Sequence, residues 1–297
     1  MQPIEHSLVG LTLRGIQSLA PSGLPIVAFH GWMDNAVSFI PLMQSLPHRA
    51  IESWDLAGHG HSDHRAVGAR YHLMDYVLDT VELLRPRNEP CIVCGHSLGG
   101  AVAAFAVAAL GADCPVKGLV LIDSLGSFPD APDRTVPGLR EASADWLQWC
   151  ESVHAPPSAE PRGYRSFEQM VTARVNGRIP VPEEVAKLLC ERSAEQLSNG
   201  RWGWRSDPRI RHHSGMRFTN DQILRLLSGV EVPTLAIVAE NSFLVAVDGW
   251  LSRADAIVDK RIVHIQGGHH LHMETAALPA VATAVNDFVL AIEESME

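Results

Sequence analysis

The 297-residue chain lacks the features that mark several classes of protein. It has no run of lysine or arginine and a formal net charge of −10, which argues against nucleic acid or an anionic membrane surface as a partner. Its longest apolar stretch, residues 101–110, is too short to cross a bilayer, so we expect no membrane span. This balance suits a neutral or cationic small-molecule substrate, and we expect a neutral, partly apolar one.

The beginning of the sequence and its cysteines also exclude common arrangements. No cationic start followed by an apolar core is visible, so we expect a cytoplasmic protein. Five cysteines, an odd number scattered along the chain, do not suggest a disulfide framework. Cys91 and Cys94 have a Cys-x-x-Cys spacing, but residues three apart on a strand point to opposite faces, which suits neither a metal nor a redox pair.

The strongest positive signal is Gly-His-Ser-Leu-Gly-Gly at residues 95–100. It follows an apolar strand pattern at residues 91–94 and precedes an alanine-rich helix pattern. A Gly-x-Ser-x-Gly element at a strand-to-helix turn is typical of a nucleophile elbow, which makes Ser97 a candidate nucleophile. Gly95 and Gly99 leave room where a β-carbon would collide with the neighbouring strand or helix.

Short apolar runs with strand character alternate with helical patterns, which predicts a mostly parallel sheet flanked by helices. An opening hairpin is expected near residues 8–14. The other expected strands cover residues 26–30, 50–55, 91–94, 118–123, 234–239 and 261–265. The expected helices cover residues 36–46, 71–84, 97–110, 220–227, 247–256 and 276–294.

Only the interval 127–217 breaks this alternation. It has no convincing strand, it carries most of the tryptophan, and its clearest amphipathic helix covers residues 183–197. We therefore predict a single α/β core made of residues 1–126 and 218–297, with a mainly helical cap inserted at 127–217.

A serine nucleophile needs a base within hydrogen-bond reach and a third group that orients the base. The loop at residues 267–274 follows the last predicted strand and places a histidine at the same sheet edge as Ser97. Its three histidines cannot be separated from the residues alone. Asp123, at the end of a strand, is one candidate acid, and Glu240, after the strand at 234–239, is the alternative.

The same histidines also raise the alternative of a metal site. A zinc ion would take its ligands from His269, His270 and His272 together with His59 or His61. Adjacent histidines lack the i, i+4 spacing of a helical zinc site, so we expect neither a metal nor a cofactor.

Attack by Ser97 would place negative charge on the substrate oxygen, and two backbone N–H groups usually stabilise it. The amide of Leu98, directly after the serine, is one expected donor of this oxyanion hole. The second is the amide of Trp32, in the sequence His-Gly-Trp-Met-Asp-Asn at residues 30–35 that follows a predicted strand.

Together these motifs resemble the α/β-hydrolase superfamily and, within it, the serine hydrolase-like proteins. The resemblance rests on residues 30–35, on Asp-Leu-Ala-Gly-His-Gly-His-Ser at 55–62, on residues 95–100 and on residues 268–274. These segments span both halves of the predicted core and leave out the cap. The resemblance implies a mostly parallel eight-stranded sheet, and it implies that His269, the histidine after the glycine pair, is the catalytic base.

One position departs from the superfamily pattern. Many members place the acid as an aspartate two residues beyond a Gly-Glu or Ala-Glu pair, and here that position is Ser242. Other members carry the acid after the preceding strand, about where Asp123 stands, so Asp123 is preferred to Glu240. The serine at position 97 separates the chain from relatives that use aspartate, such as epoxide hydrolases and haloalkane dehalogenases.

The sequence therefore predicts a metal-independent serine hydrolase that cleaves a carboxylic ester or thioester through an acyl-enzyme on Ser97. Hydrolysis of a carbon–carbon bond, a lactone or a peptide on the same triad is the alternative, because the discriminating contacts would lie in the cap. A third hypothesis is a catalytically silent ligand-binding protein, which the serine at position 242 favours. The oligomeric state and the acyl length are not predicted.

Overall fold

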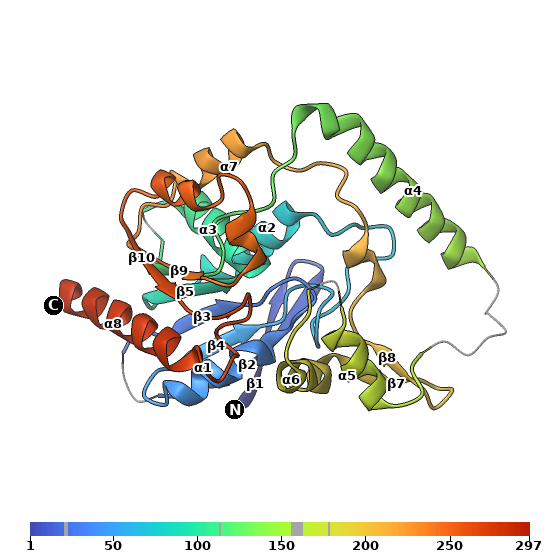
Figure 1. Cartoon of the computed structure of the whole chain (residues 1–297), viewed down its shortest axis with the longest axis horizontal. Helices are drawn as coiled ribbons and strands as arrows, with labels where there is room; N and C mark the ends of the chain where they lie inside the picture. Colours follow the sequence, from blue (N-terminus) through green and yellow to red (C-terminus); the bar gives the residue numbers. More distant parts are fainter. Residues whose placement is uncertain (21–22, 113, 156–162, 178) are drawn as a thin grey trace.

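The computed structural model describes residues 1–20, 23–112, 114–155, 163–177 and 179–297. In this part of the chain, eight strands form one sheet in the order β1-β2-β4-β3-β5-β6-β9-β10 (Figure 1). The strands from β4 to β10 pair in parallel, and β2 is antiparallel to both β1 and β4. Their bounds are β1 Gln2–Leu8, β2 Leu11–Ser18, β3 Ile26–Phe29, β4 Ile51–Trp54, β5 Cys91–His96, β6 Val116–Ile122, β9 Thr234–Ala239 and β10 Lys260–Ile265.

Both faces of the sheet are buried, because successive residues of each central strand alternate between two hydrophobic cores. Along β3, for example, Ile26 and Ala28 belong to one core, and Val27 and Phe29 belong to the other. Continuous apolar runs are typical of parallel strands that are covered on both sides. The predicted sheet of eight mostly parallel strands is therefore confirmed.

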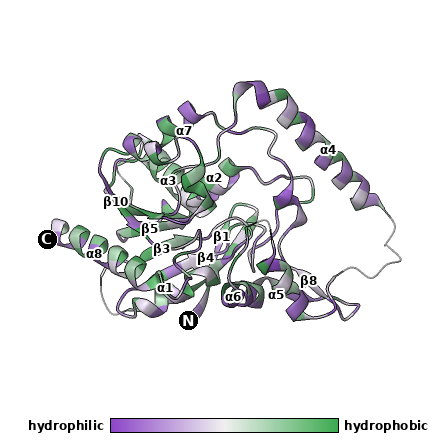
Figure 2. Cartoon of the chain, viewed as in Figure 1, coloured by the Kyte–Doolittle hydropathy of each residue, from purple (hydrophilic) through white to green (hydrophobic). Residues whose placement is uncertain are grey.

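The helices cover the two faces in separate groups. One core contains residues of α1 (Ile40–Ser45) and α8 (Leu278–Met296), and the other contains residues of α2 (Leu73–Leu84), α3 (Leu98–Leu110) and α7 (Asn220–Leu227). Figure 2 shows that α3 is predominantly hydrophobic. Among the described helices, none combines the length and the apolarity needed to cross a bilayer.

The connection between β6 and α7, residues 123–219, holds the largest departure from simple strand–helix alternation; we call it the β6–α7 segment. Residues 156–162 and 178 of this segment lie outside the described residues. It contains α4 (Thr135–His154), α5 (Phe167–Val175), α6 (Glu183–Ser193), β7 (Ala194–Gln196) and β8 (Trp202–Trp204).

The expectation that this interval has no strand is wrong, because β7 and β8 pair as a small antiparallel sheet. Each strand has only three residues, which is too short for an alternating pattern to be recognised. Trp202 packs edge-on against Phe167, and Trp204 packs in the same way against Tyr164. The predicted helix at 183–197 therefore ends at Ser193, because β7 begins at Ala194.

A second correction concerns the predicted helix at residues 247–256. The structure has one 3₁₀ helix in this interval, Leu251–Ala256, and a second, Phe243–Ala246, directly before it. Gly249 lies between them with a φ of 68°, a left-handed conformation that no right-handed helix can include. The opening hairpin is also longer than predicted, because the mostly polar residues of β1 carry no apolar signal.

Candidate active site

Ser97 occupies the turn between the end of β5 and the start of α3. Its backbone has φ 51° and ψ −116°, outside the regions that an L-residue ordinarily adopts. A β-carbon on Gly95 would lie 2.3 Å from the Gly99 carbonyl oxygen, and one on Gly99 would lie 2.1 Å from the Phe29 carbonyl oxygen. Glycine at both positions therefore lets α3 approach β5 and β3 closely enough to hold this turn.

Asp123, His269 and Ser97 form a continuous hydrogen-bonded series. His269 Nε2 lies 2.9 Å from Ser97 Oγ, and His269 Nδ1 lies 2.6 Å from Asp123 Oδ2. Asp123 is fully buried, and its other oxygen accepts a hydrogen bond from the Ala239 amide. A carboxylate only accepts, so Nδ1 carries the proton and Nε2 can accept the proton of the serine hydroxyl.

Backbone strain is concentrated around this series. Among the described residues, the non-glycine residues with a positive φ are Met33 at 66°, Ser97 at 51° and Asp123 at 44°. Met33 follows Trp32 in the loop after β3, and the other two belong to the series itself. Strained conformations of this kind cost of order 1–3 kcal/mol each and cluster at active sites and ligand clamps.

The electrostatic environment keeps His269 in its neutral form. Burial lowers the pKa of its imidazole below the ordinary value, the hydrogen bond to Asp123 opposes that shift, and His96 reinforces it. A neutral imidazole is the form that can take a proton from a serine hydroxyl.

Glu240, the alternative acid, lies elsewhere. It is exposed just after β9, and its carboxylate accepts a hydrogen bond from the Gln266 side chain. Ser242, where many superfamily members have the acid, caps a 3₁₀ helix by accepting a hydrogen bond from the Leu244 amide. The structure thus brings Asp123, not Glu240, to His269.

The two amides expected to form an oxyanion hole lie after neighbouring strands, one at the start of a helix and one in a loop. Leu98 is the first residue of α3, and Trp32 follows β3, the strand next to β5. In the described part of the chain, neither amide donates a hydrogen bond to another residue, so both can donate to a ligand. The Trp32 indole donates to the Ile210 carbonyl at 3.1 Å, which ties this loop to the β6–α7 segment.

Comparison with known proteins identifies the family to which the fold belongs. A family model described as the alpha/beta hydrolase fold matches residues 25–276. The chain belongs to the α/β-hydrolase fold family. A serine hydrolase-like protein of Danio rerio is 28% identical over 288 residues, which is 93% of this α/β-hydrolase chain and 85% of the relative.

Solved structures resemble this α/β-hydrolase over almost its whole length. The hypothetical protein PA1622 of Pseudomonas aeruginosa PAO1 is 32% identical with a TM-score of 0.85, over 97% of this chain and 99% of that one. The thioesterase domain from the curacin biosynthetic pathway is 19% identical with a TM-score of 0.77, over 98% and 99%, and shows the fold alone. Fold and relatives together support a hydrolase.

The three histidines of the loop after β10 have different surroundings in this α/β-hydrolase. Of these three described residues, only His269 is hydrogen-bonded to Ser97. His270 Nε2 bonds to Asp34 Oδ2 at 3.1 Å, and His272 is fully buried with its ring 5.3 Å from that of Phe39. Burial lowers the pKa of His270 to about 4, even though Asp34 opposes the shift.

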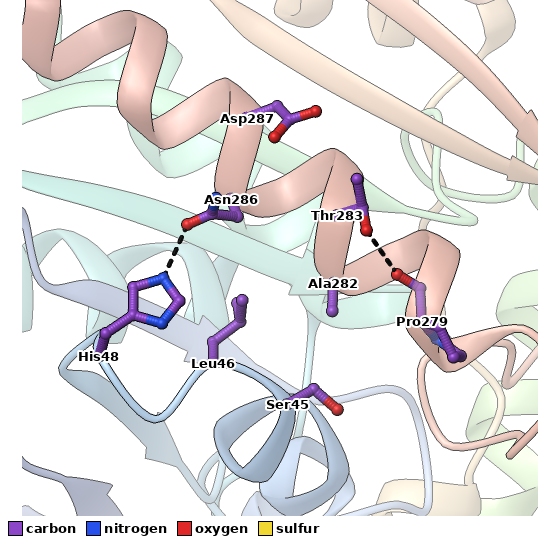
Figure 3. Close-up of a pocket in the computed structure, with 8 residues that line it drawn as sticks. All are labelled: Ser45, Leu46, His48, Pro279, Ala282, Thr283, Asn286 and Asp287. Carbon is purple, nitrogen blue, oxygen red and sulfur yellow. Dashed lines mark hydrogen bonds between the residues drawn. The ribbon is translucent and has the colours of Figure 1, made fainter.

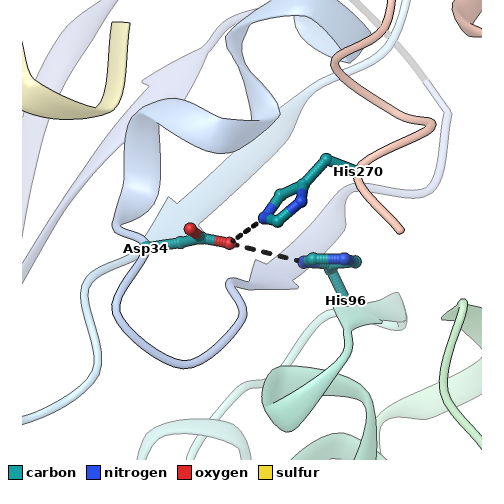
Figure 4. A group of neighbouring side chains, drawn as sticks. All are labelled: Asp34, His96 and His270. Atoms are coloured by element: carbon teal, nitrogen blue, oxygen red, sulfur yellow. Dashed lines mark hydrogen bonds and ion pairs between the residues drawn. The ribbon is translucent and has the colours of Figure 1, made fainter. Parts of the chain in front are cut away.

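The sequence analysis did not identify a buried group of three side chains that includes the residue before Ser97 and the residue after His269. Asp34, His96 and His270 place one ligand-type atom each within 4.8 Å of one another (Figure 4). Asp34 and His96 belong to the two glycine-containing motifs at residues 30–35 and 95–100, and proximity to those motifs was the only available signal.

Of the ligands considered for a zinc site, the group contains only His270. His59 is buried elsewhere, with its ring 5.0 Å from that of His30. In the group itself, Asp34 Oδ1 accepts a hydrogen bond from Arg174 at 2.9 Å. The guanidinium neutralises the carboxylate and would repel a second cation, so the donor set fits hydrogen bonding better than it fits a metal ion.

A surface cavity of about 420 Å³ lies away from these residues, between the end of α1 and α8 (Figure 3). Its lining includes His48, whose Nε2 bonds to Asn286 Oδ1 at 2.9 Å, and Asp287. None of the candidate catalytic residues lines it, so this cavity is separate from the candidate active site.

Proposed function

We propose that this chain is a serine hydrolase that cleaves a carboxylic ester or thioester, without a metal ion or cofactor, through an acyl-enzyme on Ser97. The observation that carries the proposal is the hydrogen-bonded series from Asp123 through His269 to Ser97, with separations of 2.6 Å and 2.9 Å. A nucleophile, a base and an orienting acid in this geometry form the general arrangement of serine hydrolases.

In the proposed reaction, Ser97 Oγ bonds to the substrate carbonyl carbon while its proton passes to His269 Nε2. The amides of Trp32 and Leu98 donate to the resulting oxyanion, and the loss of one such donor typically costs about 3 kcal/mol of barrier. His269 then gives the proton to the departing alcohol or thiol as the bond from the carbonyl carbon to that group breaks. Water, deprotonated by the same histidine, releases the acid and restores Ser97.

The β6–α7 segment supplies the cap in this proposal, over the predicted interval 127–217. Two contacts support its place beside the site: Ile210 accepts the hydrogen bond from the Trp32 indole, and Arg174 pairs with Asp34. The ring of Phe243 lies 4.9 Å from that of His269 and is 44% exposed. This apolar surface next to the base supports a neutral, partly apolar substrate.

Treatment with a fluorophosphonate followed by intact-mass measurement tests the proposal. The native protein should gain one adduct, and the Ser97→Ala variant should gain none. Asp123→Asn should slow labelling and ester hydrolysis by roughly 10⁴-fold, because the imidazole would lose the acceptor that fixes its tautomer. Glu240→Gln is the matched control and should label like the native protein.

Two results would contradict the proposal: no adduct under conditions that label a control hydrolase, or an adduct that persists in Ser97→Ala. A slow rate in Glu240→Gln with a normal rate in Asp123→Asn would overturn the assignment of the acid. A panel of nitrophenyl esters, a thioester, a lactone, a vinylogous diketone and a proline amide then separates ester and thioester cleavage from the alternative chemistries on the same residues.

A further inference from the structure

Asp34 is a second buried carboxylate near Ser97 and His269, and its partners lie on three other elements. We call Asp34, His96, His270 and Arg174 the Asp34 network. Asp34 follows β3, His96 ends β5 and His270 lies in the loop after β10 (Figure 4). Arg174 belongs to α5. The exposed fractions are 2% for Asp34, 0% for His96 and 4% for His270.

Each oxygen of Asp34 has a distinct role in this network. Oδ1 accepts a hydrogen bond from Arg174 Nη2 at 2.9 Å. Oδ2 bonds to His270 Nε2 at 3.1 Å, and His96 Nδ1 lies 3.6 Å from it, beyond hydrogen-bond distance. Because the carboxylate only accepts, Nε2 of His270 must carry a proton, and the orientation of this ring is thereby fixed.

His96 extends the network to the backbone of the candidate base. Its Nε2 lies 2.8 Å from the carbonyl oxygen of His269, which can only accept, so His96 donates. The residue before Ser97 is thus hydrogen-bonded to the main chain of His269. Through His270, the residue after His269, the same carboxylate reaches this loop a second time.

We propose that Asp34 is a positioning residue for the hydrolase reaction, holding the chain neighbours of Ser97 and His269 in register and connecting them through Arg174 to α5. The inference rests on the proposed function, since it assigns to Asp34 a role in the geometry of that same site. Asp34 acts through its hydrogen bond to His270 and its place beside the His96 ring; it is not itself in the reacting series.

The charge of Asp34 provides a readout that a purely structural role would not move. The titratable groups that influence His269 are Asp123 after β6, His96 on β5, Asp34 after β3 and the adjacent His270, with Arg174 paired to Asp34. A negative charge on Asp34 raises the pKa of His269 and partly offsets the effect of burial. Removal of that charge lowers this pKa, so His269 stays neutral to lower pH.

The test uses Asp34→Asn, with labelling by a fluorophosphonate and hydrolysis of a nitrophenyl ester measured from pH 5 to 9. We expect kcat and the labelling rate to fall by about 10- to 100-fold, the loss typical of a small misplacement of reacting groups, with a smaller change in KM. The acid limb of the kcat/KM profile should move to lower pH.

Arg174→Gln keeps the test informative if Asp34→Asn folds poorly. Loss of the guanidinium should also slow the reaction, but the acid limb should move slightly to higher pH, because a positive charge is removed. Arg174→Lys, which keeps that charge, should return the limb towards its native position. Shifts of the acid limb in opposite directions on removal of Asp34 and of Arg174, the two partners of one ion pair, identify an electrostatic role.

Asp79→Asn is the matched control, since Asp79 of α2 forms a comparable ion pair with Arg65. Per folded molecule, it should label at the native rate with an unmoved acid limb. A native rate and limb in Asp34→Asn, or an equal shift in Asp79→Asn, would overturn the inference while leaving the labelling of Ser97 intact. Zinc that inhibits the native protein but not Asp34→Asn would also overturn it, because the group would then bind metal.

Discussion

The two halves of the β6–α7 segment are attached to the core in different ways. The half with α5 and α6 is anchored by buried ion pairs, Arg174 with Asp34 at 2.9 Å and Arg192 with Asp55 at 2.7 Å. Its apolar residues, among them Leu189, belong to the same hydrophobic core as α8 and the sheet. This half is therefore continuous with the body of the protein.

The half with α4 makes mostly surface contacts. Of the twenty residues of α4, only Gly138 is buried, and Leu147 is 62% exposed. Figure 1 shows α4 running along the outer edge of the molecule. Within the segment, the α4 residue Asp145 is hydrogen-bonded to His213 at 2.9 Å, and a contact with the core is the stacking of the Arg70 guanidinium on Trp146 at 3.9 Å.

The contrast teaches that an inserted segment need not have one uniform stability. Breaking a buried ion pair by removing one partner leaves an uncompensated charge, whereas an exposed pair contributes little because water and salt screen it. We therefore expect α5 and α6 to unfold only with the core, and α4 to open locally at lower cost.

The largest expected effect comes from removing the cation beside Asp55. In Arg192→Ala, Asp55 would keep the amide donors of Ala36 and His61 but would lose its guanidinium, and we expect the free energy of unfolding in urea to fall by about 3–5 kcal/mol. The matched variant is Arg134→Ala, which removes an exposed ion pair with Glu141 next to α4 and should leave the unfolding midpoint unchanged. Equal effects of the two variants would remove the distinction between the halves.

An intermediate effect on the free energy of unfolding is expected when the pH is lowered. Burial lowers the pKa of His59 to about 3 and that of His270, bonded to the Asp34 beneath α5, to about 4. The unfolded chain takes up these protons near pH 6.5, so below that value it binds more protons than the folded chain, and stability falls as the pH decreases towards about 4.

The slope should be up to about 1.4 kcal/mol per pH unit for each such histidine. Urea unfolding at pH 7.5, 6.5, 5.5 and 5.0 measures it. His59→Gln should lose about one proton's share of the slope. If the free energy of unfolding fell equally with decreasing pH in the native protein and in His59→Gln, the buried His59 ring would not be responsible for the slope.

The smallest effect is expected on the outer face of α4. Leu147→Ala should change the free energy of unfolding by less than about 0.5 kcal/mol, because the side chain is already largely in solvent. Leu189→Ala on α6 is the matched change at a buried position and should cost about 2–5 kcal/mol. A large loss in Leu147→Ala would mean that α4 is more firmly packed than its exposure indicates.

Much of the fold could be predicted, because its elements carry local signals. The predicted strand at 234–239 coincides with β9, and the predicted helix at 220–227 coincides with α7, where Thr219 and Gln222 form a capping box. The 3₁₀ helices around Gly249 and the three-residue strands β7 and β8 could not be predicted, because they are too short for a periodic pattern. The division into core and cap remains a prediction.

The candidate site was predicted less completely. Residue patterns pointed to Ser97 and to a histidine loop, and a family resemblance selected His269 within it. The choice between Asp123 and Glu240 needed the structure, since only the fold shows which carboxylate reaches the imidazole. No single sequence contains a signal for the contacts of Asp34, because its partners are distant along the chain.

The two arginine–aspartate pairs also set a condition for transplanting this segment between proteins of the same fold. Asp34 and Asp55 lie in core loops, whereas Arg174 and Arg192 lie in the segment. A foreign segment that fits the gap in shape but lacks both guanidinium groups would leave two buried carboxylates without a cation. A successful chimera must therefore carry these two arginines with it, or replace the aspartates in the recipient core.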